Sequence, residues 1–177
     1  MIWDDGGHPS VGGQLSVMAR AETDADALTG SRQRAASFYA DPVAWLVVDA
    51  VGAALAEAGD EVRMCRNDVG VLSMSEAGTL HTMRQVESGA GRGRVSPLRF
   101  AGANPGSLAG LPCIVFGFKG PSLMLSMPPD AGRPVAAVVA RAWLAAGGCR
   151  YVVVNEHEQR ADGGHAVRSV IVRHTGN

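Results

Sequence analysis

Three cysteines are the side chains of this sequence best suited to covalent chemistry. Cys113 lies in an apolar run and is the most obvious candidate nucleophile, although a buried cysteine in such a run usually acts as a small hydrophobic residue. Cys65 lies between Arg63 and Arg66, which favour a lowered thiol pKa, and Cys149 follows two glycines. Because the set is odd in number and has no CxxC pair, it indicates reduced thiols rather than a disulfide framework.

Acidic residues and histidines come together in the stretch EHEQ, which begins at Glu156 and is followed by His165. On a strand, Glu156 and Glu158 face one side of the sheet while His157 faces the other. These side chains therefore do not converge on one point, and we expect no metal site here. The end of a strand and a turn is the preferred interpretation.

Periodic apolar patterns define the elements that position these residues. Strands are predicted at 14–22, 68–76, 121–127, 150–158 and 163–174, and helices at 41–60, 106–118 and 130–148. In the first helix, Asp41 is a plausible N-cap, Pro42 occupies the first helical position, and Gly59 ends the helix. Pro112 is expected near the start of the second helix.

The helix predicted at 130–148 has the spacing of an amphipathic helix, and Asp130 is expected to cap its start. Its apolar stripe is predicted to consist of Val135, Val138, Val139, Ala142, Trp143 and Ala146.

The segment 77–97 is polar and rich in glycine and arginine, which predicts a mobile loop rather than an element. The arginines between Ala77 and Asn104 are Arg84, Arg92, Arg94 and Arg99. Two interpretations stay open for them: a solvated loop, or a surface that contacts a partner. Residues 1–13 are also expected to be flexible.

The order β-α-β-α-β-α-β-β predicts one α/β domain over residues 14–177, with a mixed five-stranded sheet and helices on its faces. Hydrophobic residues make up 46% of the 177 residues, which is typical of a folded protein. A net charge of −1 does not favour nucleic-acid binding. The sequence contains no apolar run long enough for a membrane helix, and its start is not a signal peptide, so we expect a cytoplasmic protein without a cofactor.

Four motifs occur in a family-specific order. They are VSPLRF at 95–100, Asn104 followed by Pro105, FGFKGPS at 116–122, and GGCRYVVV at 147–154. Together they resemble the N-terminal half of a β-ketoacyl synthase, in the thiolase superfamily, over residues 40–173. The resemblance implies a thiolase-like half-fold, of which two copies make a complete synthase. It also implies pairing of two molecules across the strand before the nucleophile.

The same resemblance exposes departures at the reaction centre. The nucleophilic cysteine of the family falls at Pro129, which has neither a thiol nor the backbone N–H that serves the oxyanion hole. The glutamine that replaces the cysteine in some relatives is absent as well. His157, His165 and His174 do not match the family's active-site histidines, which its second half supplies. The chain is therefore expected to be a truncated relative without condensing activity.

The resemblance also indicates a surface for binding and association. In a complete synthase the helix at 130–148 packs between two sheets, and an isolated half would expose it, which marks an interface. The predicted binding and interface residues are Ser122, Leu123, Met124, Leu125, Ser126, Met127, Asp130, Arg99 and Phe100. The expected partners are a second copy, a ketosynthase subunit, or an acidic acyl carrier protein that contacts the arginine-rich segment.

The preferred function is a non-catalytic accessory subunit or acyl-binding scaffold in polyketide or fatty-acid-type biosynthesis. The alternative is an enzyme that reuses the pocket for another acyl-thioester reaction, such as transfer, dehydration or cyclisation. His81, Glu76 and Cys113 are then the candidate catalytic residues. A third possibility is a simple module that binds acyl carriers or acyl-CoA.

Overall fold

The computed structural model describes residues 15–26, 28 and 39–175, so the expectation for residues 1–13 lies outside the described residues. The strands are β1 (Leu15–Ala25), β2 (Val69–Ser75), β3 (Ser122–Leu125), β4 (Tyr151–Gln159) and β5 (His165–His174). The helices are α1 (Pro42–Ala58), α2 (Asp60–Met64), α3 (Leu80–Ala90), α4 (Pro97–Gly102), α5 (Ser107–Phe116) and α6 (Pro129–Ala145), with a 3-10 turn at Arg66–Asp68.

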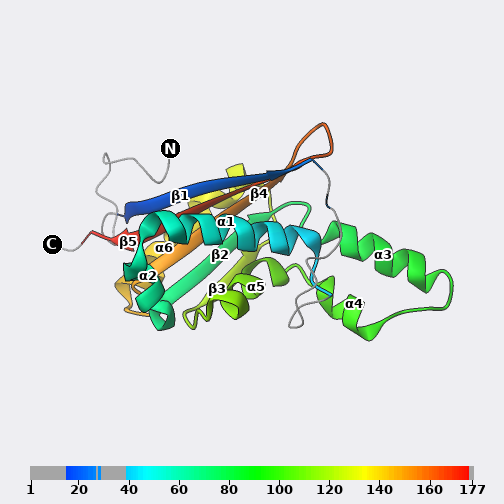
Figure 1. Ribbon diagram of the computed structural model, residues 1–177, viewed down its shortest axis with the longest axis horizontal. Helices are drawn as coiled ribbons and strands as arrows, with labels where there is room; N and C mark the ends of the chain where they lie inside the picture. Colours follow the sequence, from blue (N-terminus) through cyan, green and yellow to red (C-terminus); the bar gives the residue numbers. More distant parts are fainter. Residues whose placement is uncertain (1–14, 27, 29–38, 176–177) are drawn as a thin grey trace.

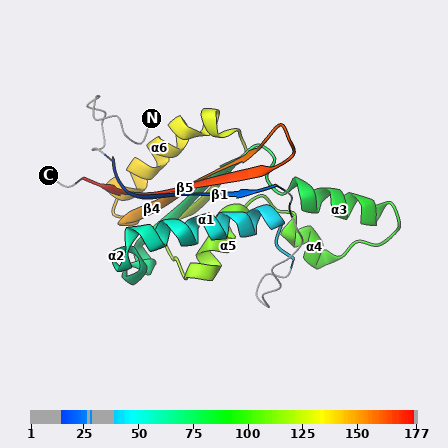
Figure 2. The ribbon, with the colours of Figure 1, turned by 45° about the horizontal axis from the view of Figure 1, so that its top comes forward.

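The strands form one five-stranded sheet in the order β1-β5-β4-β2-β3. β2 pairs in parallel with β3 and β4, whereas β5 pairs antiparallel with β4 and β1. In Figures 1 and 2, α1, α2 and α5 cover one face of the sheet, α6 covers the other, and α3 and α4 extend beyond one end. The prediction of a mixed α/β sheet is therefore confirmed.

Two apolar cores lie on the two faces of the sheet because successive strand residues point to opposite sides. On β4, Tyr151 and Val153 belong to the core under α1 and α5, and Val152 and Val154 belong to the core under α6. The other strands alternate in the same way. Each face therefore buries its own helices, and the sheet is covered on both sides.

The predicted ends of α1 are confirmed. One carboxylate oxygen of Asp41 accepts a hydrogen bond of 2.9 Å from the backbone N–H of Val43, Pro42 stands at the first helical position, and Gly59 ends the helix at φ 79°. The other carboxylate oxygen of Asp41 accepts from the backbone N–H of Thr82 in α3, also at 2.9 Å. This fully buried residue therefore joins the starts of two helices.

Pro112 lies in the middle of α5, not near its start as predicted. A proline inside a helix removes the N–H that would bond the carbonyl four residues earlier. Here that carbonyl belongs to Leu108, and it accepts a hydrogen bond of 3.0 Å from the hydroxyl of Ser73 in β2. The sheet thus supplies the donor that the proline lacks.

The segment 77–97 is not the mobile loop that its composition predicts, because α3 occupies residues 80–90 and α4 begins at Pro97. The start of α3 is held by the carboxylate of Asp41, a contact from another element. In α4, the hydroxyl of Ser96 accepts from the backbone N–H of Arg99 and Pro97 fixes the first turn. This polar segment therefore contains α3 and the start of α4, two short helices that its composition does not predict.

The buried face of α6 is not the predicted one. Val135 and Val138 are 41% and 63% exposed, whereas the residues that pack on the sheet are Ala136, Ala137, Ala140 and Leu144. Both faces of this helix carry apolar residues, and small alanines allow the close approach to the sheet. Of the predicted stripe, Val139 and Trp143 are partly buried against this core, whereas Val135, Val138, Ala142 and Ala146 face outward.

Candidate functional site

The turn between β3 and α6, where the sequence predicts the nucleophile position of the family, has prolines at its end and no cysteine. Pro128 is the N-cap of α6 without a side-chain hydrogen bond, and the buried Pro129 follows at the first helical position. Neither residue has a backbone N–H that can stabilise an oxyanion. A Cβ on Gly132 would meet the side chains of Met74 and Met127 at 3.0 and 3.4 Å, so apolar side chains pack closely behind this turn.

Asp130 does not cap α6, contrary to the prediction, because its carboxylate bonds Arg133 one turn later. Arg133 also donates two hydrogen bonds of 3.0 Å to the two carboxylate oxygens of Glu156 on β4. The Glu156 side chain is only 3% exposed, and Arg168 approaches it at 3.6 Å. These ion pairs fix α6 on the sheet, and they line a small pocket of about 270 Å³ together with Arg20, Glu22 and Val170.

The cysteines do not form a reactive centre among the described residues. The Cys113 thiol donates to the carbonyl oxygen of Ala109, and burial raises its pKa. Burial also raises the pKa of Cys149, to about 11. The group that contacts the Cys65 sulfur is the guanidinium of Arg150, at 3.3 Å. All three thiols are free, as expected for reduced cysteines.

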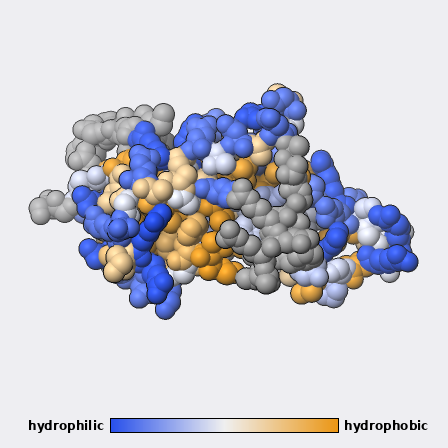
Figure 3. All heavy atoms as spheres, in the orientation of Figure 1, coloured by the Kyte–Doolittle hydropathy of each residue, from blue (hydrophilic) through white to orange (hydrophobic). Residues whose placement is uncertain are grey.

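Four of the predicted interface residues, Ser122 to Leu125, form the edge strand β3, and Ser126, Met127 and Asp130 follow it as far as the start of α6. Ser122 and Ser126 are exposed and Leu123 is 36% exposed, while Met124 and Leu125 pack against the two cores. Phe100, on α4, is 67% exposed. Arg99 belongs instead to a pocket at the end of the sheet. Figure 3 shows apolar side chains gathered over the middle of the face where α5 lies.

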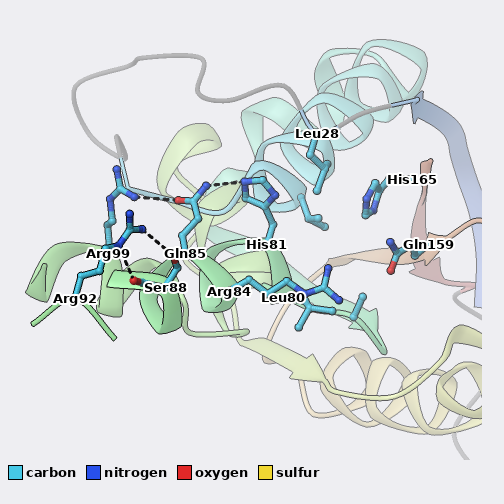
Figure 4. Close-up of a pocket in the computed structure, with 13 residues that line it drawn as sticks. Leu28, Leu80, His81, Arg84, Gln85, Ser88, Arg92, Arg99, Gln159 and His165 are labelled. Atoms are coloured by element: carbon cyan, nitrogen blue, oxygen red, sulfur yellow. Dashed lines mark hydrogen bonds between the residues drawn. The ribbon is translucent and has the colours of Figure 1, made fainter. Parts of the chain in front are cut away.

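This pocket, of about 370 Å³, lies between α1, α3, α4 and the β4–β5 hairpin. Figure 4 shows residues of α3 and α4 on one side of it and Gln159 and His165 on the other. Its lining residues are Leu28, Val43, Ala77, Gly78, Leu80, His81, Arg84, Gln85, Ser88, Arg92, Arg99, Gln159 and His165. Of the three candidate catalytic residues only His81 lines it, so the structure does not bring His81, Glu76 and Cys113 into one site.

A chain of buried hydrogen bonds leads from β2 to this pocket. The Ser75 hydroxyl accepts from the backbone N–H of Gly78 and lies 2.7 Å from Nδ1 of His157. Nε2 of His157 lies 2.9 Å from Nδ1 of His165, and the two rings stack. Each neutral ring carries one proton and a hydroxyl oxygen can accept two hydrogen bonds, so this chain can run in either direction, with the tautomers of His157 and His165 changing together.

Burial and the neighbouring His165 lower the pKa of His157 to about 4, so this ring is neutral at ordinary pH. Burial also lowers the pKa of His165, an effect that Asp41 opposes and that His81 and Arg160 reinforce.

Sequence reasoning missed this pair of histidines. His165 lies opposite Gln159 across the hairpin, which brings it diagonally next to His157 on the same face of the sheet. The hairpin turn at Asp162 and Gly163, combined with strand alternation, was the available signal. Among the described residues, no three of His, Cys, Asp and Glu gather as metal ligands, and no helix is long and apolar enough to cross a membrane.

Solved structures share this fold. A ketosynthase (ApeO) in complex with its chain length factor (ApeC) from Xenorhabdus doucetiae matches with TM-score 0.64 and 16% identity, over 92% of this chain and 80% of the matched one. A β-ketoacyl synthase from Burkholderia phymatum STM815 matches with TM-score 0.66 and 16% identity, over 84% of this chain and 46% of the other. The type II acyl-carrier protein and ketosynthase complex AntDE:AntF gives TM-score 0.65 and 12% identity, over 92% and 63%.

The fold is therefore that of the thiolase-like ketosynthases. The family model for the N-terminal domain of β-ketoacyl synthases matches residues 4–155, so the chain belongs to this family. It spans between about half and four-fifths of the length of the three solved chains described above. No curated protein matches it.

Proposed function

We propose that this chain is a non-catalytic ketosynthase-like subunit that pairs with a ketosynthase subunit of polyketide-type biosynthesis. The observation that carries the proposal is the turn at Pro128 and Pro129. It has no nucleophile, and two successive residues lack the backbone N–H that an oxyanion hole needs. The structural similarity to ketosynthases solved with a chain length factor or a carrier protein supports the class of partner.

The free edge of the sheet supports β3 as the site of pairing. β3 is the last strand in the sheet order, so one side of its backbone pairs with β2 and the other side has no strand beside it among the described residues. An edge strand of this kind can pair with a strand of another chain. Leu123 on β3 and Ile114 and Val115 on α5 add exposed apolar surface, at 36%, 65% and 37%.

The proposal is tested by native mass spectrometry of the chain, alone and mixed with ketosynthase subunits from its own gene neighbourhood. A stable complex is expected, and Leu123→Arg should weaken it at least about tenfold because a charge would be desolvated beside the paired edge. Met64→Arg is the matched control, since Met64 is 82% exposed on α2, away from β3. Equal binding by both variants would exclude β3 as the interface.

The non-catalytic part of the proposal needs its own measurement. The chain and its complex are incubated with acyl thioesters, and free thiol and acyl products are followed. We expect no turnover by the chain alone and higher ketosynthase activity in the complex. Turnover by the chain alone would favour the alternative, a different acyl-thioester reaction, for which His81 in the pocket is the one observation in favour.

A further inference from the structure

The pocket at the end of the sheet is lined by positively charged residues that have no role in the proposed pairing through β3. Among the described residues, its lining contains three arginines and two histidines and no aspartate or glutamate. Arg84, Arg92 and Arg99 make no ion pair with any carboxylate in the described part of the chain. Positive charge that faces a concave surface without a counter-ion favours an anion.

The hydrogen bonds within the pocket hold these groups without neutralising them. Arg99 donates to Oε1 of Gln85 at 3.2 Å, and the amide of Gln85 donates to Nε2 of His81 at 2.8 Å. Arg92 donates to the backbone oxygen and the hydroxyl of Ser88. Arg84 has no such partner among the described residues, so its guanidinium remains available to a ligand.

The buried histidine chain ends at this pocket. Ser75, His157 and His165 follow one another through two contacts, and His165 lines the pocket. Its Nε2 has no partner within the described residues and adds a polar group to the lining, as a donor or an acceptor according to the tautomer.

From these contacts we propose that this pocket binds a small organic anion, whose phosphate or carboxylate group is attracted by the arginines that line it. Leu28, Val43 and Leu80 supply an apolar wall for the rest of the molecule. The volume of about 370 Å³ exceeds that of a bare phosphate and lies in the range of small-molecule sites. Pro129 does not line this pocket, and binding there does not depend on the proposed pairing through β3.

The proposal is tested by isothermal titration calorimetry of the full chain at constant pH and ionic strength. Sulfate is the first probe because it is a dianion at all pH values at which the protein is handled. Arg84→Gln and Arg99→Gln should each weaken sulfate binding about tenfold or more, as expected for loss of a charge-assisted hydrogen bond. Arg94→Gln is the matched control, because Arg94 lies in the same region, is exposed and does not line the pocket.

Two further probes distinguish the sources of the anion. Phosphopantetheine supplies a phosphate ester and octanoate supplies a carboxylate, each with an extended partner for the apolar wall. Tighter binding of either one than of sulfate, lost in Arg84→Gln, supports the proposal and identifies the chemistry. No saturable binding of any probe, or equal weakening by Arg94→Gln and Arg84→Gln, would overturn it. Circular dichroism melting checks that each variant is folded.

Discussion

The buried pair of His157 and His165 makes the stability of this fold depend on pH in a defined direction. The pKa of His157 is about 4 in the folded chain and about 6.5 in an unfolded one. As the pH falls below the pKa of His157 in the unfolded chain, the unfolded state binds a proton that the folded state does not bind. Stability that is present above pH 6.5 is therefore lost progressively as the pH approaches the folded pKa.

The size of the effect follows from the separation of the two pKa values. A pH of 5 lies about 1.5 units below the pKa of the unfolded ring, which is therefore protonated. The same pH lies above the pKa of the folded ring, which is hardly protonated. At about 1.4 kcal/mol per unit, the free energy of unfolding falls by about 2 kcal/mol between pH 7.5 and pH 5 through His157 alone. His165, whose pKa is also lowered, adds to the change in the same direction.

Urea denaturation at pH 7.5 and at pH 5, followed by circular dichroism, measures this difference. In His157→Gln the pH-dependent loss should shrink by about 2 kcal/mol, even if the variant is less stable at both pH values. His174→Gln is the matched control, because His174 lies at the end of β5 outside this pair. An unchanged pH dependence in His157→Gln would refute the assignment of a buried neutral ring.

Three further predictions concern the fold and its thiols. Gly120→Ala should destabilise the chain by about 2 kcal/mol or more in urea denaturation, because the new Cβ would lie 2.5 Å from a backbone oxygen of β2, whereas Gly110→Ala, with nothing within 4 Å, should be neutral or stabilising. Arg133→Met should cost about 3 kcal/mol by leaving the buried Glu156 carboxylate without its two hydrogen bonds, and a thermal shift below 1 °C would contradict this. Iodoacetamide at pH 8 should alkylate Cys113 at least about tenfold more slowly than a free thiol, because burial raises the pKa of the Cys113 thiol. An alkylation rate equal to that of glutathione would make Cys113 a candidate nucleophile again.

The sheet and α1 could be predicted because their signals are local. Asp41, Pro42 and Gly59 mark the ends of α1, and apolar runs separated by glycines mark β2 and β4. Local residue types were sufficient for these elements because each is determined within a few residues of the chain. The assignment of the nucleophile position to Pro129, the first residue of α6, rests on the family motifs and stays a prediction.

The errors have causes that lie outside the local sequence. α3 is anchored by the bond from Thr82 to Asp41, which are 41 residues apart. In α6, apolar residues occur on both faces, so spacing alone does not reveal that Val138 faces outward. The pocket depends on the register of the β4–β5 hairpin, and on the orientation of α3 relative to it. Each of these facts belongs to tertiary structure.

The pairing of β1 with β5 has a consequence for how the chain folds. Leu15 lies opposite His174, so the first strand of the described fold binds only to the last, and β5 in turn joins it to β4. Contacts so distant in sequence require closure of a long loop before they contribute any stability, which slows folding. During synthesis on the ribosome, β1 must wait for nearly all of the intervening elements before its partner exists. Until then its edge is open, and this is the period in which we expect the growing chain to depend most on chaperones.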